Sequence, residues 1–265
     1  MSNWEQVRED FHHSVEYLRG LGFTRITLKT GSYGMEALAM AIRLATETKL
    51  DLLTIDGSGG GTGMSPWNMM ESWGVPSIFL HAKAYEYAKL LEDAGHDVVD
   101  MAFAGGIARE DQIFKALALG GKYTKLVCMG RSLMIPGFLG SNIEGALYPD
   151  RRGKVSGNWD ALPKHILEEF GSSPEEIFAG YHDVKMKVGS EEIKKIPLGA
   201  IAVWTLADKL TAGLQQLMAG ARKFNVSAIS RNDIFAANRE TAKETNIAFI
   251  TEAADDIAKQ ILKGQ

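Results

Sequence analysis

The chain has 265 residues, 45% of them hydrophobic and 23% charged, which is typical of a globular protein with one large core or a core plus an extension. A formal net charge of -4, with 29 basic residues spread along the sequence, argues against a nucleic-acid or anionic-membrane surface. The single cysteine, Cys128, excludes an internal disulfide and any cluster site that needs several cysteines of this chain. Because neither a secretory signal nor a membrane-length apolar run is visible, we expect a reducing, cytoplasmic compartment.

The first half of the chain repeats a pattern of strand, glycine-containing loop and helix, which is typical of parallel α/β folds. Apolar residues at helical spacing predict a helix over 4–21 before the first repeat, whereas residues 151–265 contain only helical and connecting patterns. The four predicted repeats are strand 23–29 with helix 35–48, strand 50–56 with helix 82–94, strand 98–103 with helix 109–119, and strand 124–129 with a helix that starts near Ser132.

The glycine clusters all follow predicted strands, so the sequence predicts parallel strands with one functional face. An open doubly wound sheet and a (β/α)8 TIM-type barrel share this pattern. Barrels often bind phosphate through backbone amides of the loops after their last two strands. Gly105, Gly106 and Gly130 suit that role, and Arg131 adds a fork-shaped cation for phosphate oxygens. The position of these residues after the third and fourth predicted strands favours the barrel, in which these four strands would be the last four of eight.

The segment 56–66, DGSGGGTGMSP, is the most informative part of the sequence. Its glycines leave the backbone bare just after a strand, so we expect a flat or anionic ligand to approach its N–H groups. The spacing does not match the dinucleotide-binding fingerprint, and no Gly-Lys-Ser/Thr of a phosphate-binding loop occurs in the chain. The structural alternative is a flexible glycine-rich connection without a ligand.

These motifs resemble the FMN-binding barrel domain of glutamate synthases and their shorter relatives. The segment 56–66 is similar to that family's D-G-x-x-G-G-T-G-x-x-P signature, and the strand Ile26-Thr27-Leu28-Lys29 resembles one that ends in a flavin-contacting lysine. The resemblance covers about residues 22–150 and continues more weakly beyond. It implies an FMN-dependent oxidoreductase that transfers a hydride between FMN and a small imino or keto acid.

The resemblance also implies roles for individual residues. Lys29 would stabilise negative charge on reduced FMN, although a solvated lysine at a strand end is the structural alternative. Asp56 would hydrogen-bond the ligand or brace its own glycine turn. The remaining cofactor-binding residues would be Gly59, Gly60, Gly61 and Thr62 along the flavin ring, with Gly105, Gly106, Gly130 and Arg131 around the phosphate.

Two departures limit what the resemblance implies. Glutamate synthases bind an iron–sulfur cluster through three cysteines just after the last barrel strand, whereas this chain has one cysteine before Gly130. We therefore expect no iron–sulfur cluster and no metal site. Ser2 follows Met1, so this chain also has no N-terminal nucleophilic cysteine of the glutaminase kind.

Four strands make half a barrel, which leaves open edges that invite pairing. We expect residues 1–150 to form the C-terminal half of an FMN-binding barrel and residues 151–265 to form a mostly helical extension. The chain would then be a fragment of a longer enzyme, join a partner that carries the other half, or pair with itself. A non-catalytic flavin-binding or assembly subunit is one alternative function. An FMN barrel acting on hydroxy acids is another, with His81 as the available base, although we expect His81 to be structural.

Overall fold

The computed structural model describes residues 3–61, 65–152 and 163–264, which form two compact units. The first unit consists of Met1–Ile107, Asp111–Cys128 and Met218–Gln265, and the second of Ala108–Glu110 and Met129–Leu217. The boundaries of these two units differ from those of the expected domains, 1–150 and 151–265, which stay a prediction. Among the described residues, none of the helices combines the length and apolar character needed to span a membrane.

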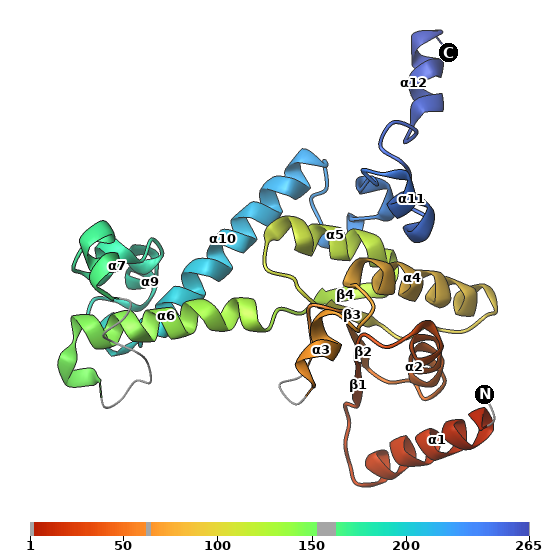
Figure 1. Ribbon diagram of the computed structural model, residues 1–265, viewed down its shortest axis with the longest axis horizontal. Helices are drawn as coiled ribbons and strands as arrows, with labels where there is room; N and C mark the ends of the chain where they lie inside the picture. Colours follow the sequence, from red (N-terminus) through yellow and green to blue (C-terminus); the bar gives the residue numbers. More distant parts are fainter. Residues whose placement is uncertain (1–2, 62–64, 153–162, 265) are drawn as a thin grey trace. The chain divides into compact units, whose positions relative to one another are not determined.

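The first unit contains a four-stranded parallel sheet in the order β1-β2-β3-β4, as the strand–helix repeats predict (Figure 1). This α/β architecture is confirmed, and it is compatible with part of a barrel. Its strands are β1 (Thr27–Thr30), β2 (Leu52–Asp56), β3 (Met101–Ala104) and β4 (Thr124–Val127). Its helices up to β4 are α1 (Trp4–Gly20), α2 (Met35–Glu47), α3 (Trp67–Glu71), α4 (Ser77–Asp93), α5 (Glu110–Gly120) and the 3-10 turn η1 (Gly121–Tyr123).

One face of the sheet forms the core of the first unit. Leu53, Ile55, Met101 and Phe103 are fully buried, and His81 of α4 stacks on Phe103 from that side. Because side chains alternate along a strand, the intervening residues face the other way. The register aligns Lys29, Thr54, Ala102 and Leu126 in one row on this second face. Both ends of the row, Lys29 and Leu126, are exposed.

The structure differs from the sequence expectation at β1 and near α3. β1 begins at Thr27 and not at residue 23, because the Ile26 amide donates to the carboxylate of Asp51 at 2.8 Å instead of joining the ladder. A short helix, α3, follows Pro66, where the sequence predicted none. A five-residue helix is too short to show a periodic apolar face, so periodicity could not reveal it.

The C-terminal part of the chain returns to the first unit. Arg231 fastens it there, since its guanidinium donates to the carbonyl oxygens of Leu119 at 2.6 Å and Thr245 at 2.5 Å. Ala236 and Ile247 pack with Ala82 and Leu119 in a small buried cluster. The elements of this part are η4 (Val226–Ala228), η5 (Arg231–Asp233), α11 (Arg239–Thr245) and α12 (Asp255–Leu262).

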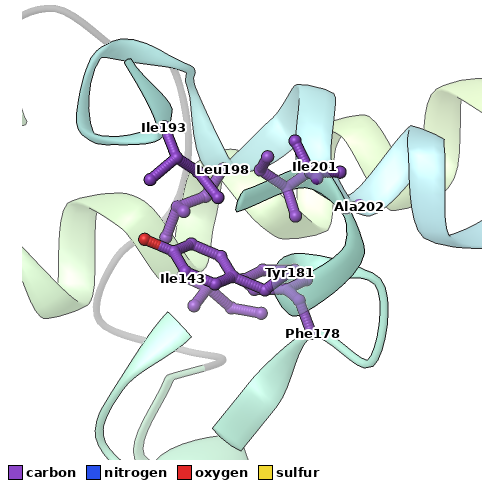
Figure 2. Packing of buried hydrophobic residues seen from close by; sticks show 8 residues of the cluster. Ile143, Phe178, Tyr181, Ile193, Leu198, Ile201 and Ala202 are labelled. Atoms are coloured by element: carbon purple, nitrogen blue, oxygen red, sulfur yellow. The ribbon is translucent and has the colours of Figure 1, made fainter. Parts of the chain in front are cut away.

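In its described residues, the second unit consists of helices and their connections. It does not coincide with the expected helical extension 151–265, which stays a prediction. Its core gathers eight buried residues, including Ile143, Tyr181, Ile193 and Ile201, between helices far apart in sequence (Figure 2). Its elements are α6 (Arg131–Leu147), η2 (Pro149–Arg151), α7 (Pro163–Phe170), α8 (Pro174–Ile177), α9 (Tyr181–Val188), η3 (Ile193–Lys195) and α10 (Leu198–Gly220), whose last residues belong to the first unit.

Candidate functional site

The parallel strands of the first unit bring several of the expected site residues to one edge of the sheet. Lys29 lies near the end of β1, Asp56 ends β2, and Gly105 follows β3. In parallel α/β sheets, ligands bind outside the carboxyl ends of the strands. The candidate site is therefore this edge of the first unit.

Lys29 and Asp56 form an ion pair across neighbouring strands. The Lys29 Nζ lies 2.8 Å from Asp56 Oδ2, and the aspartate side chain is only 6% exposed while the lysine side chain is 46% exposed. A buried carboxylate with a charged partner holds that partner in place. The ammonium group is thus fixed at the strand end, with its outer side open to solvent.

The first amides of the glycine loop after β2 donate hydrogen bonds to other parts of the protein, contrary to the expectation that they are open to a ligand. Four consecutive amides donate to backbone carbonyl oxygens: Gly57 to Ala104 at 2.9 Å, Ser58 to Val75 at 2.8 Å, Gly59 to Met70 at 2.6 Å, and Gly60 to Gly57 at 2.8 Å. This part of the loop therefore offers a ligand its side-chain-free surface and not these donors. Thr62, the last of the expected ring-lining residues, lies outside the described residues.

Two serines hold the glycine loop, and sequence reasoning missed both roles. Ser58 Oγ donates to the carbonyl oxygen of Glu71 at 2.7 Å, which ties the loop to α3. Ser77, at the start of α4, donates to the carbonyl oxygen of Gly105 at 2.8 Å and lies 3.1 Å from that of Ser58. A serine that begins a helix is a common sequence signal for capping. Nothing in the sequence shows that this one bridges the loops after β2 and β3.

The glycines of the two loops interlock. A Cβ at Gly60 would collide with Asp56 Oδ1 and would lie 2.7 Å from the Cα of Gly105. A Cβ at Gly105 would lie 2.8 Å from the amide nitrogen of Gly57. Close packing of backbone on backbone thus requires glycine at these positions. The loop also folds over the carboxylate of Asp56, so Asp56 lies beneath its own glycine turn.

Gly105 and Gly106 carry backbone donors of the kind that residues 57–60 use within the protein. Both have positive φ angles, +114° and +71°, which favour glycine. Within the described part of the chain, neither amide donates a hydrogen bond to a protein acceptor. Successive backbone amides in such conformations can form a concave site for an anion.

Gly130 and Arg131 belong to the second unit, where Gly130 precedes α6 and Arg131 is its first residue. Both residues are exposed. Lys29, Asp56, the glycine loop and Gly105-Gly106 all belong to the first unit. The structure therefore brings together only the first-unit members of the expected set, and the joint phosphate role of the two loops stays a prediction.

His81 is a structural residue, as expected. It lies within α4, where it is 2% exposed and stacks on Phe103 with ring centroids 4.0 Å apart. Its Nε2 lies 3.3 Å from the carbonyl oxygen of Ile55. Burial lowers the pKa of His81 to about 4, although hydrogen bonds to the Ile55 and Ala104 backbone oppose the shift. Its side chain is buried in the core, beside the last residues of β2 and β3.

Cys128 follows β4 and is half-buried. Its amide donates to the carbonyl oxygen of Phe103 at 2.8 Å, which extends the pairing of β4 with β3. Burial raises the pKa of the Cys128 thiol, while the nearby Lys29 charge acts in the opposite direction. In the ranges that the structure describes, no three His, Cys, Asp or Glu side chains gather as a metal site would require.

Comparison with known proteins assigns this region to a family. Residues 6–136 match the model of the conserved region in glutamate synthase. The chain is also similar to the archaeal glutamate synthase [NADPH] of Methanocaldococcus jannaschii, with 28% identity over 163 residues. That alignment covers 60% of this chain and 30% of the archaeal protein, so the chain spans only a part of its relative's length. Over residues 6–136, the chain belongs to the glutamate synthase-like family.

Proposed function

We propose that this chain carries the cofactor half of an FMN-dependent oxidoreductase of the glutamate synthase-like class. Its reaction would transfer a hydride between FMN and a small imino or keto acid. The observation that carries the proposal is the strand-end site of the first unit. There, the Lys29–Asp56 ion pair lies at the same edge as the amides of Gly105 and Gly106, which donate to no acceptor among the described residues.

The residues of this site fit the two ends of FMN. The amides of Gly105 and Gly106 would donate to phosphate oxygens. The phosphate-binding role expected for Arg131, which belongs to the second unit, does not follow from this geometry and stays a separate prediction. The side-chain-free surface of Gly59, Gly60 and Gly61 would lie against the flavin ring. Bound FMN would supply a centre that accepts and donates hydride.

The Lys29–Asp56 pair would orient the positive charge of the site. Asp56, beneath the glycine turn, fixes the ammonium group of Lys29 at 2.8 Å and leaves the outer side of that group open. A fixed cation stabilises negative charge that develops next to it without first having to reorganise. Asp56 would thus be a positioning residue, and Lys29 would be the residue that contacts the cofactor.

The edges and the second face of the sheet, which carries Lys29 and Leu126, support the proposal that further strands complete the barrel. β1 and β4 each pair with a single strand among the described residues, and the exposed Leu126 lies on the face away from the helices. α1 precedes β1 and docks on α2, as the helix of a preceding strand–helix unit would. The missing strands would come from another segment, a partner chain or a second copy of this chain.

Light scattering coupled to size-exclusion chromatography tests this completion. A second copy predicts a dimer, which Leu126→Lys should convert to monomers because it places a charge on the shared face. A monomer that gains strand protection only on adding the N-terminal half of a relative's barrel supports a separate partner. A monomer that neither dimerises nor binds that half would contradict the proposal.

A non-catalytic flavin-binding or assembly subunit is the second candidate, because half a barrel can hold a cofactor without a complete substrate pocket. Reduction of the flavin-loaded chain by a donor, followed by reoxidation with an acceptor, would favour the enzyme. Action on hydroxy acids has less support, since its expected base, His81, is buried against Phe103.

Equilibrium titration with FMN tests the phosphate assignment. Arg131→Ala should weaken FMN binding by about tenfold or more, because it removes a charge-assisted hydrogen bond. The matched control is Arg25→Ala, which changes an exposed arginine before β1 and should leave the affinity unchanged. Equal affinities of both variants and the parent chain would remove Arg131 from the site.

A further inference from the structure

A cavity of about 360 Å³ lies wholly within the second unit, in a part of the chain outside the family match. That volume is within the range of small-molecule sites. Short elements from η2 to the start of α10 supply most of its walls. The lining residues are Tyr148, Arg151, Pro174, Glu175, Tyr181, Ile193, Lys194, Ile196 and Leu198.

The walls combine a rigid apolar part with a few polar groups. Ile193, Leu198 and Tyr181 also belong to the buried core of the second unit, so the cavity rests on packed side chains (Figure 2). Ile196 and Pro174 extend the apolar surface. Such a mixture of apolar walls and few polar groups is typical of ligand sites.

Tyr181 contributes an unused hydrogen-bonding group. The residue is 7% exposed, and its hydroxyl makes no hydrogen bond to another described residue. Figure 2 shows the hydroxyl directed away from Phe178, toward the side where Ile193 lies. Burial raises the pKa of Tyr181, with a further contribution from Glu175, so the hydroxyl keeps its proton. The hydroxyl oxygen is not fully buried, so it is available to donate a hydrogen bond to a ligand in the cavity.

The charges on the walls are of both signs and are already balanced. Arg151 lies 2.9 Å from Glu144 Oε1, and that buried glutamate also accepts from the amide of Leu198 at 3.0 Å. Lys194 pairs with Glu191 at 2.7 Å, and Glu175 pairs with Lys185 at 3.7 Å. Each charged lining side chain is therefore paired with an oppositely charged side chain outside the lining, and these pairs together leave no net charge to attract a multiply charged anion.

We propose that this cavity binds an α-amino acid with an apolar side chain. Arg151 and the hydroxyl of Tyr181 would donate to its carboxylate, and Glu175 would accept from its ammonium group. Its side chain would lie against Ile193, Ile196 and Leu198. A ligand with one charge of each sign can bond both a lining cation and the lining anion, whereas a phosphate or a dicarboxylate would place a further negative charge near Glu175.

The two hydrogen bonds that Arg151 already donates do not prevent this role. Arg151 has five N–H donors, of which one bonds Glu144 and one bonds the carbonyl oxygen of Lys194 at 3.3 Å. Its guanidinium also lies 4.6 Å from the ring centroid of Tyr148. These contacts fix the plane of the guanidinium, so its remaining donors are preorganised for a carboxylate.

Isothermal titration calorimetry of the full chain without FMN tests the proposal, so its result is independent of the oxidoreductase activity. The probes are L-leucine, isocaproate, which lacks the ammonium group, and isopentylamine, which lacks the carboxylate. We expect L-leucine to bind at least about tenfold more tightly than either analogue, since each analogue lacks one of the two charged groups that would bond the walls.

Two variants assign the ends of the ligand. Glu175→Gln should weaken binding of L-leucine about tenfold and leave isocaproate unchanged, whereas Tyr181→Phe should weaken both. Glu192→Gln is the matched control, because Glu192 pairs with Lys195 outside the cavity. Absence of heat with L-leucine, equal binding of the analogues, or no effect of either variant would overturn the proposal.

Discussion

At the residue scale, the Lys29–Asp56 pair has a structural role as well as its proposed role at the cofactor. The carboxylate is 6% exposed beneath the glycine turn, and Lys29 is its charged partner. Removing one partner of such a pair leaves the other buried and uncompensated. A loss of function in a single variant would therefore not separate the two roles.

A double-mutant cycle separates them. Lys29→Met should lower the free energy of unfolding by about 1–3 kcal/mol, because it leaves the Asp56 carboxylate without its charged partner. The double variant with Asp56→Asn should recover part of that loss. Urea unfolding followed by circular dichroism measures both. Additive effects of the two changes would show that the pair contributes nothing to stability.

The same variants report on the cofactor. Lys29→Met should leave FMN binding mostly intact and lower the reduction potential of the bound flavin, because the variant lacks the fixed positive charge. Asp56→Asn keeps that charge and should shift the potential less. A potential that does not change in Lys29→Met would count against contact between Lys29 and the flavin.

At the element scale, α1 is fastened to α2 through one buried carboxylate. The side chain of Glu47 on α2 is 8% exposed. Its carboxylate accepts a hydrogen bond from Arg8 at 2.7 Å and lies 3.2 Å from His12 Nε2, and both of these partners are on α1. Arg43, one turn earlier on α2, also bonds Glu47. Burial alone would raise the pKa of Glu47, but these hydrogen bonds outweigh it and lower the pKa from 4.5 to about 2.

The shifted pKa predicts how pH affects this junction. Because the pKa is lower in the folded chain, the stabilisation is present above about 4.5 and is lost as the pH falls toward 2. Glu47→Gln should therefore lower the free energy of unfolding at pH 7 by about 1–3 kcal/mol, with a smaller difference near pH 3. Urea unfolding at the two pH values measures it.

Glu16→Gln, an exposed change on α1, is the matched control and should have little effect at either pH. An equal loss for Glu47→Gln at both pH values would contradict the ionic account of the junction.

The sequence predicted the elements of the first unit better than their contacts. Apolar runs that stop at polar residues and glycines predicted that strands end near Lys29 and Asp56. Because the strands were expected to be parallel, both residues were expected at the same edge of the sheet. The internal use of the Gly57–Gly60 amides depends on acceptors such as Ala104 and Val75, which lie far along the chain. Local patterns contain no such information. Ser77 and Glu47 were missed for the same reason, since their partners are set by tertiary packing.

At the scale of the whole molecule, the chain combines the region that matches the family with a second, helical unit. The family match ends at residue 136, and the second unit extends from residue 129 to Leu217. The site of the first unit and the cavity of the second use separate residues. FMN binding and amino-acid binding are therefore independent predictions, and either can fail without the other.

The central claim is that the strand-end site of this chain holds FMN. Its most direct test is the visible absorbance spectrum of the purified full-length chain after incubation with FMN and desalting. We predict retained flavin bands, at reduced intensity for Arg131→Ala and at full intensity for Arg25→Ala. A folded chain that retains no flavin, both alone and with the complementary half barrel of a relative, would contradict the account.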